Sequence, residues 1–131
     1  ECYDITLEIL RVLKMRDHFV MSLIQQSSFL LAMIEEAGKI DKEVMEKIDQ
    51  NLAEAVKLAN DIQRLDFVAD VEYLFWRTNR IFNQPEKAEH HRLIALNQLI
   101  DIGEENLRQE QKHRIKELQA NLPGDWGKNH S

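Results

Sequence analysis

The chain has 131 residues and a net charge of −6, from 23 acidic and 17 basic side chains. A chain of this length fits one domain and buries roughly two-thirds of its unfolded surface, so its stability requires no metal or disulfide. The acidic balance argues against a general nucleic-acid binder, because affinity for the phosphate backbone comes from clustered Lys and Arg. The single cysteine, Cys2, excludes an intrachain disulfide and suits a reducing compartment, so we expect a cytoplasmic location.

The composition predicts an all-α fold. Leu, Ile, Glu, Lys, Gln and Ala dominate, whereas the whole chain holds only four Gly and two Pro. Between Cys2 and Gln84 the only helix breaker is Gly38. The longest uninterrupted apolar run, from Phe29 to Ile34, is far too short to cross a bilayer. We therefore expect an antiparallel bundle of long helices without a transmembrane segment.

Residues 4–37 are predicted to form one helix of about 50 Å, at 1.5 Å per residue. Its apolar positions recur near the period of a packed helix face and are interrupted by Arg16 and by the polar residues 25–28. The methionines at helical spacing are interpreted as core residues rather than as ligands. The predicted apolar stripe comprises Ile5, Ile9, Val12, Phe19, Leu23, Leu30 and Ile34, and the methionines are Met15, Met21, Met33 and Met45.

The best-marked helix boundary lies at residues 38–41. Gly38 supplies a C′ position, where a left-handed backbone conformation is tolerated. Asp41 is the predicted N-cap of the next helix, because its carboxylate can accept hydrogen bonds from free amide groups. Ile40 and Met45 stand at the N′ and N4 spacing of a hydrophobic staple. These signals predict a short connection between two helices.

The middle of the chain allows two architectures. Residues 42–83 contain no Gly, no Pro and no cluster of turn residues, which favours three long helices over 4–37, 42–83 and 85–120. The alternative is a break near residues 60–66, giving four or five helices, since a 42-residue helix is rare. Pro85 suits the first position of the last helix.

The last predicted helix contains Gly103, which either lowers the local stability of the helix or ends it there. Beyond it, residues 104–118 are highly charged but balanced, as in a solvent-exposed or coiled-coil helix. We expect residues 1–120 to form a single helical bundle domain and residues 121–131 to form an irregular tail.

Five of the nine aromatic residues lie between Phe67 and Phe82. Apolar side chains occupy two faces of this segment, and a helix that is apolar on two sides is buried on two sides. It is therefore either the central helix of the bundle or a helix that also meets another chain. We predict an interaction surface with aromatic anchors and flanking cations. Its members are Tyr73, Phe75, Trp76, Arg77 and Arg80.

The segment 75–91 also contains the only candidates for a metal site. Glu86 and His90 lie one helical turn apart and share a face. Carboxylate–histidine sites in bundles need ligands from several helices, and the only Glu-x-x-His motif lies about 20 residues further on. Capping alone explains most of the segment, because acidic residues complement a helix start and basic residues complement a helix end. We expect no bound metal and no cofactor.

These patterns predict a non-enzymatic helical protein–protein interaction module that self-associates or binds another protein. No Gly-flanked Ser, phosphate-binding glycine loop or Cys with a nearby His points to catalysis. Two alternatives stay open: a carboxylate–histidine metal-binding bundle at Glu86 and His90, and a nucleic-acid-associated regulator. The second requires Arg77, Arg80 and Arg92 to form one exposed strip beside Trp76.

Overall fold

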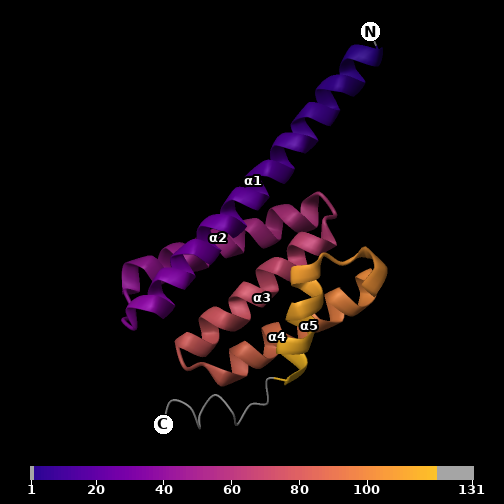
Figure 1. Cartoon of the computed structure of the whole chain (residues 1–131). Helices are drawn as coiled ribbons and strands as arrows, with labels where there is room; N and C mark the ends of the chain where they lie inside the picture. Colours follow the sequence, from indigo (N-terminus) through magenta and orange to yellow (C-terminus); the bar gives the residue numbers. More distant parts are fainter. Residues whose placement is uncertain (1, 121–131) are drawn as a thin grey trace. The chain divides into compact units, whose positions relative to one another are not determined.

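The computed structural model describes residues 2–120, except for the side chains of residues 2–7, 10 and 13 (Figure 1). The predicted tail, 121–131, lies outside the described residues. Within the described part all regular structure is helical, which confirms the predicted all-α, bundle-like class. The elements are α1 (Cys2–Ala37), α2 (Lys42–Asp61), α3 (Leu65–Ile81), α4 (Pro85–Ile102), the 3-10 helix η1 (Glu104–Asn106) and α5 (Gln109–Ala120).

The favoured arrangement of three long helices is wrong. The predicted helix 42–83 is divided into α2 and α3 by residues 62–64, and the predicted helix 85–120 is divided after Ile102. The alternative with a break near residues 60–66 and five helices is confirmed for the described chain. The first predicted helix, 4–37, is also confirmed as α1.

The break after α2 has a specific backbone cause. Gln63 adopts a left-handed conformation with φ of 58°. Its N–H donates to the Asn60 carbonyl, and the Arg64 N–H donates to the Ala59 carbonyl, which is the Schellman pattern of a helix C-terminus. Asn83, with φ of 57°, ends α3 through the same pair of bonds. Two helices thus end without glycine, because the hydrogen bonds of the motif offset the cost of a left-handed residue.

The chain divides into two compact units, Glu1–Phe67 and Val68–Ser131. The first contains α1, α2 and the start of α3, and the second contains the rest of α3 with α4, η1 and α5. The prediction that residues 1–120 form a single domain stays a prediction.

In the first unit, α1 and α2 pack against each other and are joined by the predicted loop at residues 38–41 (Figure 1). Gly38 has φ of 71°, and the Asp41 carboxylate accepts bonds from the amides of Glu43 and Val44, so both predicted boundary roles are confirmed. The side-chain amide of Asn51 donates to Gln26 at 3.0 Å and links the two helices. The buried apolar residues recur at helical spacing: Val20, Leu23, Leu31 and Ile34 on α1, and Met45, Ile48, Leu52, Ala55 and Ala59 on α2.

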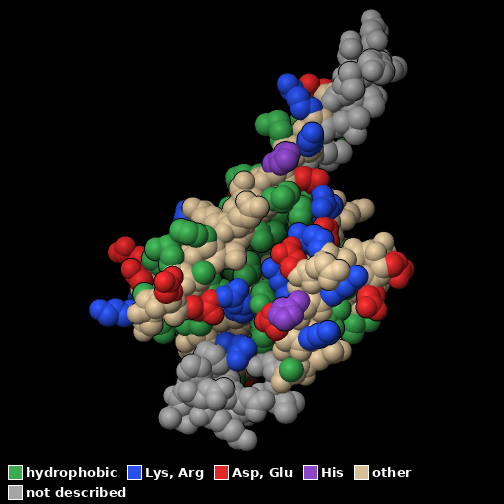
Figure 2. Space-filling model, in the orientation of Figure 1, with side chains coloured by type: hydrophobic (Ala, Val, Ile, Leu, Met, Phe, Trp, Pro, Cys, Tyr) green, Lys and Arg blue, Asp and Glu red, His purple; other side chains and the backbone are tan. Residues whose placement is uncertain are grey.

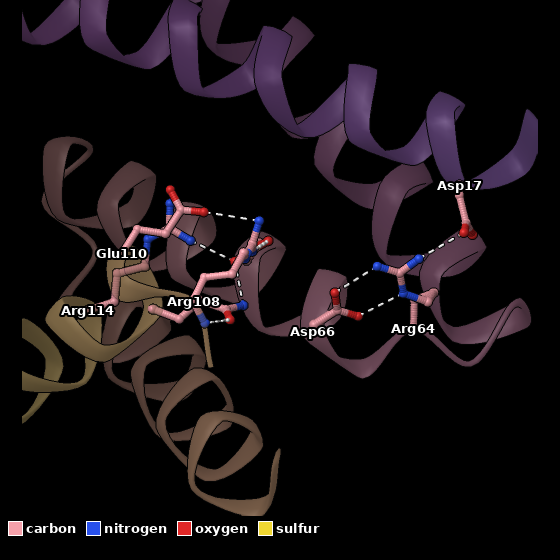
Figure 3. A network of polar contacts seen from close by, with 8 residues as sticks. Asp17, Arg64, Asp66, Arg108, Glu110 and Arg114 are labelled. Carbon is pink, nitrogen blue, oxygen red and sulfur yellow. Dashed lines mark hydrogen bonds and ion pairs between the residues drawn. The ribbon is translucent and has the colours of Figure 1, made fainter. Parts of the chain in front are cut away.

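In the second unit, polar contacts fix α5 to α3 (Figure 3). The buried carboxylate of Asp70 accepts hydrogen bonds from Arg108, from Gln111 at 3.2 Å and from Arg114 at 2.6 Å. Burial raises the pKa of Asp70 above its ordinary value, and the positive charges of Arg114 and Arg108 oppose that rise. A buried carboxylate is tolerated here because each oxygen has donors.

No helix in residues 2–120 combines the length and apolar character that a membrane span needs.

The cap of α2 gives a first test. Because Asp41 accepts bonds at 3.0 Å and 3.3 Å from two amides that have no helical partner, Asp41→Ala should lower the free energy of unfolding by about 1 kcal/mol. Asp41→Asn keeps an acceptor oxygen and should lose much less. Urea denaturation followed by circular dichroism measures both changes. An Ala variant as stable as the unmodified protein would contradict the capping role.

Candidate interaction surface

Helix α1 carries a second row of apolar side chains, which is open to solvent. Its seven positions recur every three or four residues in strict alternation, the heptad spacing by which helices pair in coiled coils. Five of them are apolar, and the two central ones, Ser22 and Gln26, are polar. Its five apolar members are between 40% and 65% exposed, the lowest value at Val12 and the highest at Phe29. Figure 2 shows apolar side chains open to solvent along α1. We call this row the α1 seam: Val12, Met15, Phe19, Ser22, Gln26, Phe29 and Met33.

The α1 seam is distinct from the face of α1 that packs against α2. At 100° per residue, its mean direction lies about 110° around the helix from the buried row Val20, Leu23, Leu31 and Ile34. A helix with apolar residues on two sides is normally buried on two sides. Helix α2 covers only one of them, so the α1 seam has the character of an uncovered interface.

Unequal helix lengths leave more of α1 uncovered. Helix α1 has 36 residues and α2 has 20, so α1 runs on by about 24 Å (Figure 1). Near the end of α2, Arg64 donates to Asp17 of α1 at 2.8 Å and to both oxygens of Asp66 (Figure 3). Ile9 and Val12 lie beyond this point. Ile9, Val12 and Phe19 were predicted as members of the packed stripe and are instead exposed.

The same correction applies to the methionines. Met45 is buried, as its interpretation as a core residue requires. Met15, Met21 and Met33 are exposed, so that interpretation is wrong for them. Flexible, polarizable methionine side chains are common on surfaces that bind other proteins, and two of these three belong to the α1 seam.

A groove of about 610 Å³ lies beside the α1 seam. Met15, Phe19 and Ser22 of α1 form one wall, and Glu54 and Leu58 of α2 form part of the other. Both helices belong to the first unit, so the groove is complete within it. Its lining is mixed: Met15, Phe19 and Leu58 are apolar, whereas Arg16, His18 and Glu54 are ionisable. The three apolar side chains can receive an apolar side chain from a partner, with the ionisable groups beside it.

The aromatic residues predicted as anchors lie on α3. Tyr73 and Trp76 are buried, Trp76 being only 2% exposed, while Phe75 is half-buried and stacks on the His91 ring at 4.7 Å. A ring that is already buried has little further area to lose on binding. The prediction that Tyr73, Phe75, Trp76, Arg77 and Arg80 form an interaction surface stays a prediction, and the α1 seam has the stronger physical case.

The arginines of the nucleic-acid hypothesis are partly buried and engaged with their own chain. The guanidinium of Arg77 lies 5.7 Å from the Tyr73 ring centre, and that of Arg80 lies 4.7 Å from the Trp76 ring centre. Arg92 donates to both oxygens of Glu89 and, at 2.9 Å, to the carbonyl of Leu118. The hydrogen bonds from Arg92 lower the pKa of Glu89. An arginine held by a carboxylate and a carbonyl offers fewer donors to phosphate.

The residues of the metal hypothesis, Glu86 and His90, are both exposed. The neighbouring His91 contacts Glu72 through Nδ1, so it already has an acidic partner. Among the described residues, no group of three or more His, Cys, Asp and Glu side chains is placed to hold a metal ion. No described ligand set therefore favours the metal hypothesis.

Comparison with protein-family models, with curated proteins and with solved structures finds no match for this chain. The case for a function therefore rests on the geometry of the chain itself. Among the described residues, the α1 seam with its groove is the exposed apolar surface that most strongly favours burial against a partner.

The environment of Tyr73 gives a second test. Burial, together with the 2.9 Å hydrogen bond to Glu117, raises the pKa of Tyr73 to about 12. The stability that depends on the neutral phenol should be complete below about pH 10 and should decline as the pH rises toward 12. Ultraviolet titration of the phenolate should show a late step that Tyr73→Phe removes. A Tyr73 that ionises near pH 10 would contradict its burial.

Proposed function

We propose that this protein is a non-enzymatic helical interaction module that associates with itself. The observation that supports the proposal is the α1 seam, five large apolar side chains held at heptad spacing on one continuous helix. The spacing matters because only a period near 3.5 residues keeps two helices in contact along their whole length.

Burial of the α1 seam is the proposed driving force for self-association. From Val12 to Met33 the row is about 33 Å long at 1.5 Å per residue. Complete burial of a Phe or Met side chain contributes roughly 1.5–3 kcal/mol. A half-exposed side chain contributes part of this free energy when it becomes buried. Association costs several kcal/mol in lost translational and rotational freedom. A seam of five such side chains with an adjoining groove is therefore consistent with a moderate affinity.

A second copy of the chain is the simplest partner for such a surface. Every copy presents the same row, so two copies can bury both rows in one symmetric interface. Figure 2 also shows charged side chains on the surface of the described residues, and a polar rim around an apolar centre is the usual anatomy of a reversible interface.

Substitutions on the α1 seam test this proposal directly. Phe19→Glu and Phe29→Glu place charges in the proposed interface and should weaken self-association by about tenfold or more, equivalent to about 1.4 kcal/mol. The matched control is Leu93→Glu on α4, because Leu93 is 46% exposed and Phe19 is 47% exposed. Size-exclusion chromatography with light scattering should show a mass above one chain for the unmodified protein and for the control.

Two outcomes would overturn the proposal. One is a single-chain mass for the unmodified protein at the highest attainable concentration. The other is an unchanged mass in both seam variants, provided that circular dichroism shows native helix content. Either result would leave the exposed row without the role proposed for it.

A further inference from the structure

The order of residues along the α1 seam indicates what covers it. We infer that α1 of a second copy lies on the seam in antiparallel orientation. This inference rests on the proposed function and deepens it, because it names the partner and its direction. The apolar residues Met15 and Phe19 precede a polar centre of Ser22 and Gln26, and the apolar residues Phe29 and Met33 follow it. The pattern is thus the same when read from either end.

An antiparallel register about residue 24 matches every inner position of the seam. Ser22 then lies opposite Gln26 of the second copy. The amide oxygen of Gln26 accepts from Asn51 of its own chain, and its NH2 group can donate to the Ser22 hydroxyl. Phe19 lies opposite Phe29 of the second copy, and Met15 lies opposite Met33. The polar pair stays at the centre, and the apolar pairs flank it on both sides.

The groove fits this register. Phe29 has the largest exposed fraction among the exposed large hydrophobic residues of the described chain. In the antiparallel register, Phe29 of the second copy lies beside Phe19, which together with Met15 and Leu58 lines the groove. A volume of about 610 Å³ is ample for one phenyl ring. The two-fold symmetry of the pair creates this contact twice.

Charge distinguishes the antiparallel from the parallel arrangement. Residues 9–16 carry three bases and no acid, namely Arg11, Lys14 and Arg16, whereas the other end of α1 carries Glu35 and Glu36. A parallel pair would place each base beside its own copy, and like charges at that distance oppose pairing. The antiparallel register places Glu36 of the second copy opposite Val12 and adjacent to Arg11, the preceding residue. The exposed ion pair of Arg11 with Glu8 does not prevent this, because such surface pairs contribute little.

Disulfide cross-linking of the full chain tests the orientation. Two single-cysteine variants, Met15→Cys and Met33→Cys, are made with Cys2→Ser to remove the native thiol. In the antiparallel register position 15 lies about 27 Å along the helix from its own copy, far beyond the roughly 7 Å between Cα atoms that a disulfide allows. Mild oxidation should therefore cross-link the mixed variants efficiently and each variant alone only weakly.

The alternative results have distinct meanings. Efficient cross-linking of each variant alone would show a parallel pair and overturn the orientation while leaving self-association in place. A dimer by light scattering without cross-links in any mixture would move the interface away from α1 and overturn the inference. A single-chain mass for the unmodified protein would overturn the proposed function itself.

A charge exchange gives a readout that does not depend on cysteine. Arg11→Glu and Glu36→Arg should each weaken the dimer several-fold, and the double variant should restore it. Restoration is expected only if residue 11 of one copy meets residue 36 of the other. A double variant as weak as the sum of the two single variants would contradict the register.

Discussion

The apolar surface of α1 is larger than the surface that α2 can cover. This difference determines which side chains of the first unit are buried and which are exposed. Helix α1 holds 36 residues against 20 in α2, and its apolar residues occupy two faces about 110° apart. The inner face packs with α2 through residues such as Leu31 and Ile48. The outer face retains five exposed apolar side chains at heptad positions. Their burial against a further helix would remove apolar area from water.

The second unit contains most of α3 and pairs the buried carboxylate of that helix with side chains of α5 and the residue before it. Nearly every residue of α3 from Phe67 to Asn79 is buried, including the carboxylate of Asp70. Asp70 is satisfied by Arg108, Gln111 and Arg114, and Arg92 of α4 donates to a carbonyl at the end of α5. The helix whose two apolar faces suggested a partner therefore has those faces buried, whereas α1 carries the exposed apolar row.

The helix boundary with its own capping residues was predictable from the sequence. Which apolar faces of α1 are covered by α2 was not. Gly38 and Asp41 mark a boundary that can be recognised from residue type. Glycine readily adopts the left-handed conformation that ends a helix, and an aspartate carboxylate accepts hydrogen bonds from the first amides of the next helix. Gln63 gives no such signal, since its left-handed conformation is fixed by Schellman bonds rather than by residue type. That hidden break shortens α2. Periodicity placed Ile9, Val12 and Phe19 in one packed stripe. It could not show that α2 ends before reaching Ile9, nor that Val12 and Phe19 belong with Met15 and Met33 to a second, exposed row.

Methionine oxidation tests the central claim, that the outer face of α1 is buried when copies meet. Met15 and Met33 belong to the α1 seam, whereas Met21 is exposed but lies on neither apolar face of α1 and serves as an internal reference. Peroxide oxidation, followed residue by residue with mass spectrometry over a range of protein concentrations, reports the access of each sulfur. The account predicts that Met15 and Met33 become protected as concentration rises while Met21 keeps its rate. Unchanged oxidation of all three at every concentration would contradict it.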